Sequence, residues 1–119
     1  MNTKPPASPA NATLAVNAGL PYEVIAFGFS EEREDDASSI GLPVLRALVL
    51  IRPEDEAWIR ESEQGNRELI CVLDPAAPAS QIGAFTFMGR VAGFRDLRDG
   101  QVAVEFASIG PVMPHFLRR

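Results

Sequence analysis

The sequence predicts a mainly β protein: a small single-domain antiparallel β-barrel with one short helix and a short C-terminal helical turn. Its 119 residues suffice for one domain but not for two ordinary ones. Five segments have the apolar, β-branched or alternating composition of strands, and short links join them. Glycines interrupt the longest of these segments, as they do where a sheet bends into a barrel.

Residues 1–20 are predicted to form a flexible arm, followed by the barrel domain at residues 21–119. The arm is rich in Pro, Ala, Asn, Ser and Thr, and such a segment buries too little apolar surface to offset its ordering entropy. Its longest apolar run, Leu14-Ala15-Val16, is too short for the core of a secretory signal. Nowhere does an apolar run approach the roughly 20 residues that cross a bilayer. We therefore expect a cytoplasmic protein without membrane insertion.

Two strands and a helix are predicted in the first half of the domain. Tyr22–Phe29 is rich in aromatic and β-branched residues, which favour a strand. Val44–Ile51 is an apolar run of strand length between two prolines, which predicts a buried strand. Pro53–Gln64 is predicted to be a helix, because proline suits the first turn and three acidic residues follow it there. Gly65 ends this helix.

The second half contains a third strand at Glu68–Leu73 and a long extended segment at Gln81–Phe94. Glycines at three positions interrupt the long segment and predict bulges or bends: Gly83, Gly89 and Gly93.

A tight turn and a half-buried strand follow. Asp99-Gly100 is a strong turn signal. In the segment 102–107, the large apolar residues Val102, Val104 and Phe106 alternate with Ala103, Glu105 and Ala107, which predicts one inner and one outer face. Pro111–Arg119 is predicted to form the short terminal helical turn.

The charge of the chain limits its partners. With 16 acidic and 11 basic residues the net charge is −5, which disfavours nucleic-acid binding because that requires clustered Lys and Arg. The distribution is uneven, since residues 1–88 carry −7 and residues 89–119 carry +2. Such a bipolar surface could orient a charged partner. One Cys and one His exclude both an internal disulfide and a Cys/His zinc site.

Catalytic chemistry has little support, and we expect a non-enzymatic protein without a cofactor. Cys71 lies in an apolar run, where a thiol usually behaves as a small buried hydrophobe. No spacing supports a Cys71/His115 dyad or a triad of Ser38, His115 and an acid. Phosphate-binding glycine loops are absent. The acidic run at residues 31–36 lacks the alternating spacing of a calcium loop, so we expect a solvated loop and no metal.

One short motif stands out. Residues 36–41 read Asp-Ala-Ser-Ser-Ile-Gly and fit the pattern Asp/Asn-x-Ser-x-x-Gly, while Gly89-Arg90-Val91 and the strand at 102–106 fit later in the same order. Together they resemble the PilZ domain family over roughly residues 22–119. The resemblance implies a small antiparallel barrel of a kind that often binds cyclic di-GMP. It assigns contacts with guanine and phosphate groups to Asp36, Ser38 and Gly41.

The chain departs from the family in its arginines. The Arg-x-x-x-Arg motif ahead of the first strand is absent, and only Lys4 and Arg33 precede Asp36. Paired guanidinium groups hold phosphates through bidentate bonds, which one Lys cannot replace. The resemblance therefore implies a regulatory or adaptor module that acts through protein contacts, with weak or no binding of cyclic di-GMP. If the nucleotide does bind, Arg33 and Arg46 are the first candidates for phosphate contacts.

Other interpretations stay open. The chain could be an acidic interaction protein, such as a phage-encoded inhibitor, whose carboxylates at residues 31–36 and 54–63 bind a basic surface of a target. An oligonucleotide-binding barrel fits less well, because its groove should be basic and studded with aromatic residues. The match at residues 36–41 could also be an ordinary polar turn.

Overall fold

The fold is a closed antiparallel β-barrel with one helix, as seen in a computed structural model that describes residues 12–30, 43–75 and 84–115. The elements are β1 (Thr13–Val16), β2 (Tyr22–Ser30), β3 (Val44–Leu50), the 3-10 turn η3 (Pro53–Asp55), α1 (Glu56–Gln64), β4 (Leu69–Asp74), β5 (Ala84–Asp96), the 3-10 turn η4 (Arg98–Gly100) and β6 (Val102–His115).

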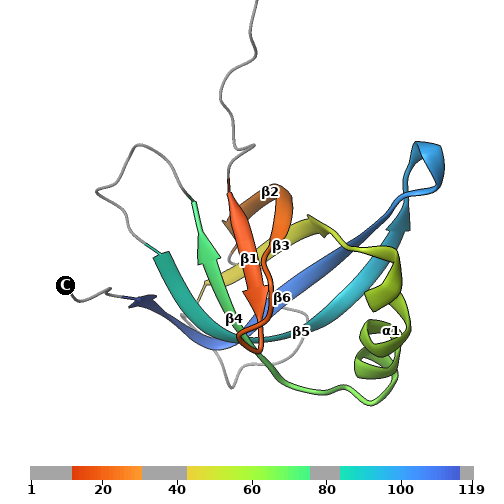
Figure 1. Cartoon of the computed structure of the whole chain (residues 1–119). Helices are drawn as coiled ribbons and strands as arrows, with labels where there is room; N and C mark the ends of the chain where they lie inside the picture. Colours follow the sequence, from red (N-terminus) through yellow and green to blue (C-terminus); the bar gives the residue numbers. More distant parts are fainter. Residues whose placement is uncertain (1–11, 31–42, 76–83, 116–119) are drawn as a thin grey trace, which may run out of the picture.

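The barrel closes in the order β1-β2-β3-β6-β5-β4, and β4 returns to pair with β1 (Figure 1). Every neighbouring pair is antiparallel. The predicted barrel is therefore confirmed, and the five predicted strands correspond to β2 through β6. The barrel has a sixth strand, β1, which the sequence patterns did not indicate.

The prediction of a flexible arm is wrong where β1 lies. Leu14 of this strand pairs with Tyr22 of β2 on one side and with Leu73 of β4 on the other. The side chains of Leu14 and Val16 are buried in the core. A four-residue strand has almost no stability alone, but this one gains ladder partners on both edges and closes the barrel. Residues 1–11 lie outside the described part of the chain.

The predicted C-terminal helical turn is also wrong for residues 111–115. β6 continues through this segment and pairs with the first half of β5, for example Val112 with Phe87. The strand can follow β5 because the pairing register shifts here, and Gly110 adopts a positive φ of 85° that other residues disfavour. Residues 116–119 lie outside the described part.

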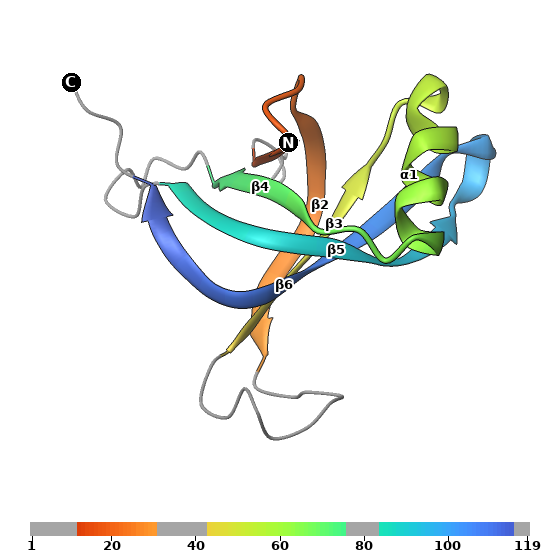
Figure 2. The ribbon, with the colours of Figure 1, turned by 90° about the horizontal axis from the view of Figure 1, so that it is seen from below.

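Two irregularities shape β5, which Figure 2 shows as a long curved strand beside β6. Between Val91 and Gly93 this strand carries one residue more than β6, which is a β-bulge. At Gly89 the neighbouring strands come close: an added Cβ would lie 3.2 Å from both the Sγ of Cys71 and the carbonyl oxygen of Ala107. The glycine-rich composition of this segment thus reflects both bending and close packing.

The core fills the barrel from every strand. Its largest fully buried side chains come from five strands and the helix: Phe106, Leu14, Leu45, Ile59, Leu73, Val24, Val49, Val104 and Cys71. In β6, Val104 and Phe106 belong to the core cluster while Glu105 lies outside it, as the alternation predicted, but the outward-facing Ala103 and Ala107 are buried as well.

The predicted helix is confirmed as η3 followed by α1, with Pro53 in the first turn. Ile59 is fully buried and Trp58 packs against the core. The guanidinium of Arg60 lies 4.0 Å from the centre of the Phe94 ring and attaches the helix to β5. Gly65 ends the helix, and its N–H donates to the carbonyl oxygen of Glu61 at 2.9 Å.

Candidate functional site

The outer surface of β2, β3, β6 and β5 carries a row of arginines around one carboxylate. On antiparallel strands, residues that face each other share one side of the sheet. Arg46 of β3 faces Ala107 of β6, and Ala107 also faces Arg90 of β5. The Cα atoms of the two arginines are therefore two strand spacings apart, about 10 Å.

A second row on the same surface runs from Leu50 through Ala103 to Arg95. Glu105 lies between the two rows, with Leu48 and Gly93 as its neighbours. We call the surface formed by Arg46, Arg90, Arg95 and Glu105 the arginine face. The β6 residues between the arginines are small, which leaves room for the long side chains to extend over them.

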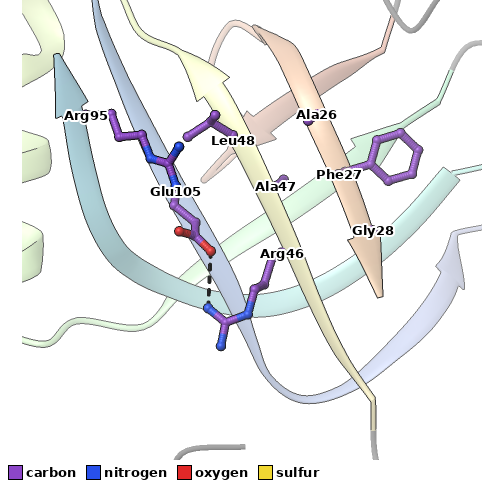
Figure 3. Close-up of a pocket in the computed structure, with 8 residues that line it drawn as sticks. All are labelled: Ala26, Phe27, Gly28, Arg46, Ala47, Leu48, Arg95 and Glu105. Carbon is purple, nitrogen blue, oxygen red and sulfur yellow. Dashed lines mark hydrogen bonds and ion pairs between the residues drawn. The ribbon is translucent and has the colours of Figure 1, made fainter. Parts of the chain in front are cut away.

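A shallow groove of about 320 Å³ occupies part of the arginine face. Figure 3 shows Arg46, Arg95 and Glu105 projecting on one side of β3 and β6. The remaining lining is small or apolar: Ala26, Phe27, Gly28, Ala47 and Leu48. The alanines of β6 between the charged groups, Ala103 and Ala107, are nevertheless buried, so a partner would contact the charged side chains rather than the sheet itself.

The arginines of this face differ in their pairing. Nη1 of Arg46 lies 3.1 Å from Oε2 of Glu105, in an ion pair that is partly exposed. Within the described part of the chain, Arg90 and Arg95 form no hydrogen bond or ion pair, and both are exposed. The four charged groups sum to +2 in a chain whose net charge is −5. This face is therefore a basic area on an acidic protein.

The chemistry of the face follows from these groups. A guanidinium presents planar N–H donors that match a carboxylate or phosphate in bidentate geometry. Arg90 and Arg95 are available for such bonds without first breaking an internal one. Glu105 adds a carboxylate that accepts hydrogen bonds, so the face can bind a surface that offers both anions and donors.

Of the five site residues predicted from the sequence, the structure describes Arg46, which lies on the arginine face. The other four, Arg33, Asp36, Ser38 and Gly41, lie outside the described residues. Their segment joins β2 to β3, and Ser30 and Val44, the last and first residues of these strands, pair with each other.

Sequence reasoning missed Arg90, Arg95 and Glu105 as members of one site. Two signals pointed toward them. The excess of basic residues after position 88 already indicated a local positive charge. The alternation in residues 102–107 placed Glu105 on the outer face, and the structure agrees.

Cys71 has no accessible thiol. Its side chain is fully buried in the core, and burial raises its pKa to about 12. The thiol therefore stays protonated and packs as a hydrophobe, as the sequence predicted. Among the residues that the structure describes, no three His, Cys, Asp or Glu side chains come together to hold a metal ion.

Comparison with protein-family models, with curated proteins and with solved structures finds no match to this chain. In the described ranges, no helix has the length and apolar character needed to span a membrane.

Proposed function

We propose that this protein is a non-enzymatic regulatory or adaptor module that resembles a PilZ domain and acts by binding another protein through its arginine face. The observation that carries the proposal is a pair of exposed guanidinium groups on one side of the sheet, Arg90 and Arg95, which have no partner among the described residues. Arginines that form no internal bond contribute little to the fold, so their free donors support a role in recognition.

Two further features support the PilZ-like reading. That family implies a small antiparallel barrel, and this chain forms one. The motif at residues 36–41 belongs to the connection between β2 and β3. Arg46 lies two residues into β3, with Gly28 of β2 facing it, so the motif and the arginine face belong to adjoining parts of the chain.

Cyclic di-GMP should bind weakly or not at all. The nucleotide carries two phosphates, and the nearest described arginine to the motif, Arg46, is already paired with Glu105. The carboxylate of Glu105 would also repel a phosphate on this face. A protein surface that presents carboxylates to Arg90 and Arg95 and a donor to Glu105 fits the pattern better.

The test of the protein-binding role compares two double charge reversals. Arg90→Glu/Arg95→Glu should reduce capture of the partner from source-cell extract at least tenfold, because like charges would then face each other. Arg67→Glu/Arg98→Glu is the matched control, since it changes the net charge equally with exposed arginines that do not belong to the arginine face. Equal capture by both variants would refute a role for the arginine face.

The nucleotide is tested separately by calorimetric titration with cyclic di-GMP at moderate salt. Charged hydrogen bonds contribute about 1.5–3 kcal/mol each. Because the chain lacks the two arginines of the family motif, two such bonds are missing, and the affinity for cyclic di-GMP should be weaker by roughly two to four powers of ten. Submicromolar binding would overturn this expectation, and alanine at Arg33 or Arg46 would then identify the phosphate contacts.

A second candidate function is that of an acidic interaction protein, such as a phage-encoded inhibitor. The observation that favours it is the exposed set of carboxylates on η3 and α1: Glu54, Glu61 and Glu63 form no hydrogen bond or ion pair within the described residues. Glu61→Lys/Glu63→Lys separates the two functions. A partner lost with this variant but retained by Arg90→Glu/Arg95→Glu would support the acidic-inhibitor function.

A further inference from the structure

A second cavity lies at the end of the barrel and shares no lining residue with the groove on the arginine face. It is about 480 Å³ in volume and is formed where three connections meet: the start of β2, the β3–η3 junction and the η4 turn. We call it the end cavity. Its apolar walls are Pro21, Leu50, Ile51, Pro53 and Val102. A volume of this size accepts a short aliphatic chain with a polar head.

Among the described residues that line the end cavity, the cation is Arg52, and its guanidinium is held by the protein itself. Nε of Arg52 lies 3.3 Å from Oδ2 of Asp55, and its two terminal nitrogens each donate at 3.1 Å to the carbonyl oxygens of Pro21 and Leu20. The guanidinium also lies 4.2 Å from the centre of the Tyr22 ring. The positive charge of Arg52 is therefore balanced, and the face of the Tyr22 ring is covered.

Unlike Arg52, two carboxylates of the lining have no internal partner among the described residues. Glu23 and Asp99 are exposed and form no hydrogen bond or ion pair within the described part of the chain. A third, Glu56, is 2.8 Å from Nε of Arg60 on the helix. The free charges of the end cavity are thus negative, while its walls are apolar.

From this arrangement we infer that the end cavity binds an alkylammonium group. The apolar walls would contact the aliphatic chain, and Glu23 and Asp99 would accept hydrogen bonds from the ammonium group. An ammonium group fits this cavity better than a guanidinium group. A guanidinium gains from stacking on an aromatic ring, but Arg52 already covers the face of the Tyr22 ring. The source is either a free alkylamine or a lysine side chain of another protein.

The test is an NMR titration of the full chain with n-butylamine, which is an ammonium ion at pH 7. The backbone amides of Gly100, Gln101 and Val102 should shift in a saturable way. Butan-1-ol and butyrate have the same chain without the positive charge, so they should bind at least fivefold more weakly. N-acetyl-lysine methylamide represents the lysine side chain, and the tighter of the two ammonium probes identifies the source.

Two substitutions locate the binding groups. Glu23→Gln and Asp99→Asn should each weaken n-butylamine binding about two- to fivefold, as expected for exposed charge pairs. Asparagine is chosen because it tolerates the positive φ of 68° at position 99. Glu61→Gln removes an exposed carboxylate of α1 outside the cavity and should leave the affinity unchanged.

Salt provides a measurement that needs no variant. Binding of n-butylamine to the native chain should weaken as NaCl rises from 0.05 to 0.5 M, whereas binding of butan-1-ol should not weaken. Equal affinity for butylamine and butanol, or unchanged affinity in the Glu23→Gln/Asp99→Asn double variant, would overturn the inference.

Discussion

The two faces of the sheet formed by β3, β6 and β5 have opposite chemistry although they share the same strands. Inward, Val49, Val104 and Phe106 are fully buried. Outward, Arg46 and Glu105 alternate with them and stay partly exposed. Because neighbouring residues of a strand point to opposite sides of the sheet, a residue that stabilises the core stands next to one that is available for recognition. Substitutions on one face should therefore leave the properties of the other intact.

The arginines show the same contrast. Arg52 uses its donors on Asp55 and on two backbone carbonyl oxygens, so its removal would leave internal acceptors without donors. Arg90 and Arg95 have no such partners among the described residues. Residue type alone thus does not distinguish an arginine that holds the fold from one available for a partner.

The largest loss of stability is expected when β1, the strand that closes the barrel, is removed. Deletion of residues 1–18 removes β1 with Leu14 and Val16, and each buried aliphatic side chain contributes about 2–5 kcal/mol. The sum approaches the whole stability of a small domain, about 5–15 kcal/mol. We expect this variant to lack a cooperative thermal transition in circular dichroism. Deletion of residues 1–11 is the control and should melt cooperatively.

Phe106→Ala should have the next largest effect. Phe106 is fully buried in the core, so its truncation should cost about 3–5 kcal/mol in the free energy of unfolding. Urea denaturation measures the loss. A cost below that of the outer-face variant Glu105→Ala would mean that the two faces of β6 are assigned the wrong way round.

Gly89→Ala tests the close approach of the strands on the inner side. The added Cβ would lie 3.1 Å from the Phe87 ring and 3.2 Å from the Sγ of Cys71. Overpacking of this kind costs about 1–3 kcal/mol. The comparison variant is Gly93→Ala, because an added Cβ there meets no atom within 4 Å. Similar urea midpoints for both variants would argue against a packing role for Gly89.

Tyr22→Phe probes the polar group at the end of the core. The Tyr22 hydroxyl donates to Oδ2 of Asp55 at 2.7 Å, and this bond is the main cause that lowers the pKa of Asp55 below its ordinary 3.8. A lowered carboxyl pKa stabilises the fold above pH 3.8 and loses that effect as pH falls through the lowered value.

The variant should therefore be less stable at pH 7, by about 1 kcal/mol for one hydrogen bond. Its stability should also fall less steeply than that of the native chain in acid. Urea denaturation at pH 7 and at pH 3 measures both quantities. Parallel curves for the two proteins would show that the hydrogen bond does not control the Asp55 pKa.

The smallest effects are expected on the outer face. Glu105→Ala breaks a partly exposed ion pair, which contributes about 0.2–1 kcal/mol. Arg95→Ala removes a side chain that has no partner among the described residues, so the free energy of unfolding should change by no more than about 0.5 kcal/mol. Urea denaturation that shows a larger loss for Arg95→Ala would give this arginine a structural role and weaken its assignment to partner binding.

Local patterns in the sequence were sufficient to predict most of the fold. The apolar run at 44–51, the alternation at 102–107 and the proline-initiated helix each carry their signal in neighbouring residues. β1 and the end of β6 carry no such signal, because their stabilisation comes from pairing with other strands rather than from their own residues. Leu14 is fixed by β4, and Val112 by β5. Pairing with these partner strands decided that the two segments are strands.

In the candidate site, too, some features follow from local sequence and others only from strand pairing. The sequence alone determined that Glu105 points outward, because the alternation at residues 102–107 is regular, whereas the outward position of Arg46 came from the structure. Arg90 and Arg95 are five residues apart, so strict alternation would place them on opposite faces. The extra residue between Val91 and Gly93 reverses the alternation and brings both arginines to the outer side. The tertiary structure decided this, because a bulge is defined by the register with the partner strand.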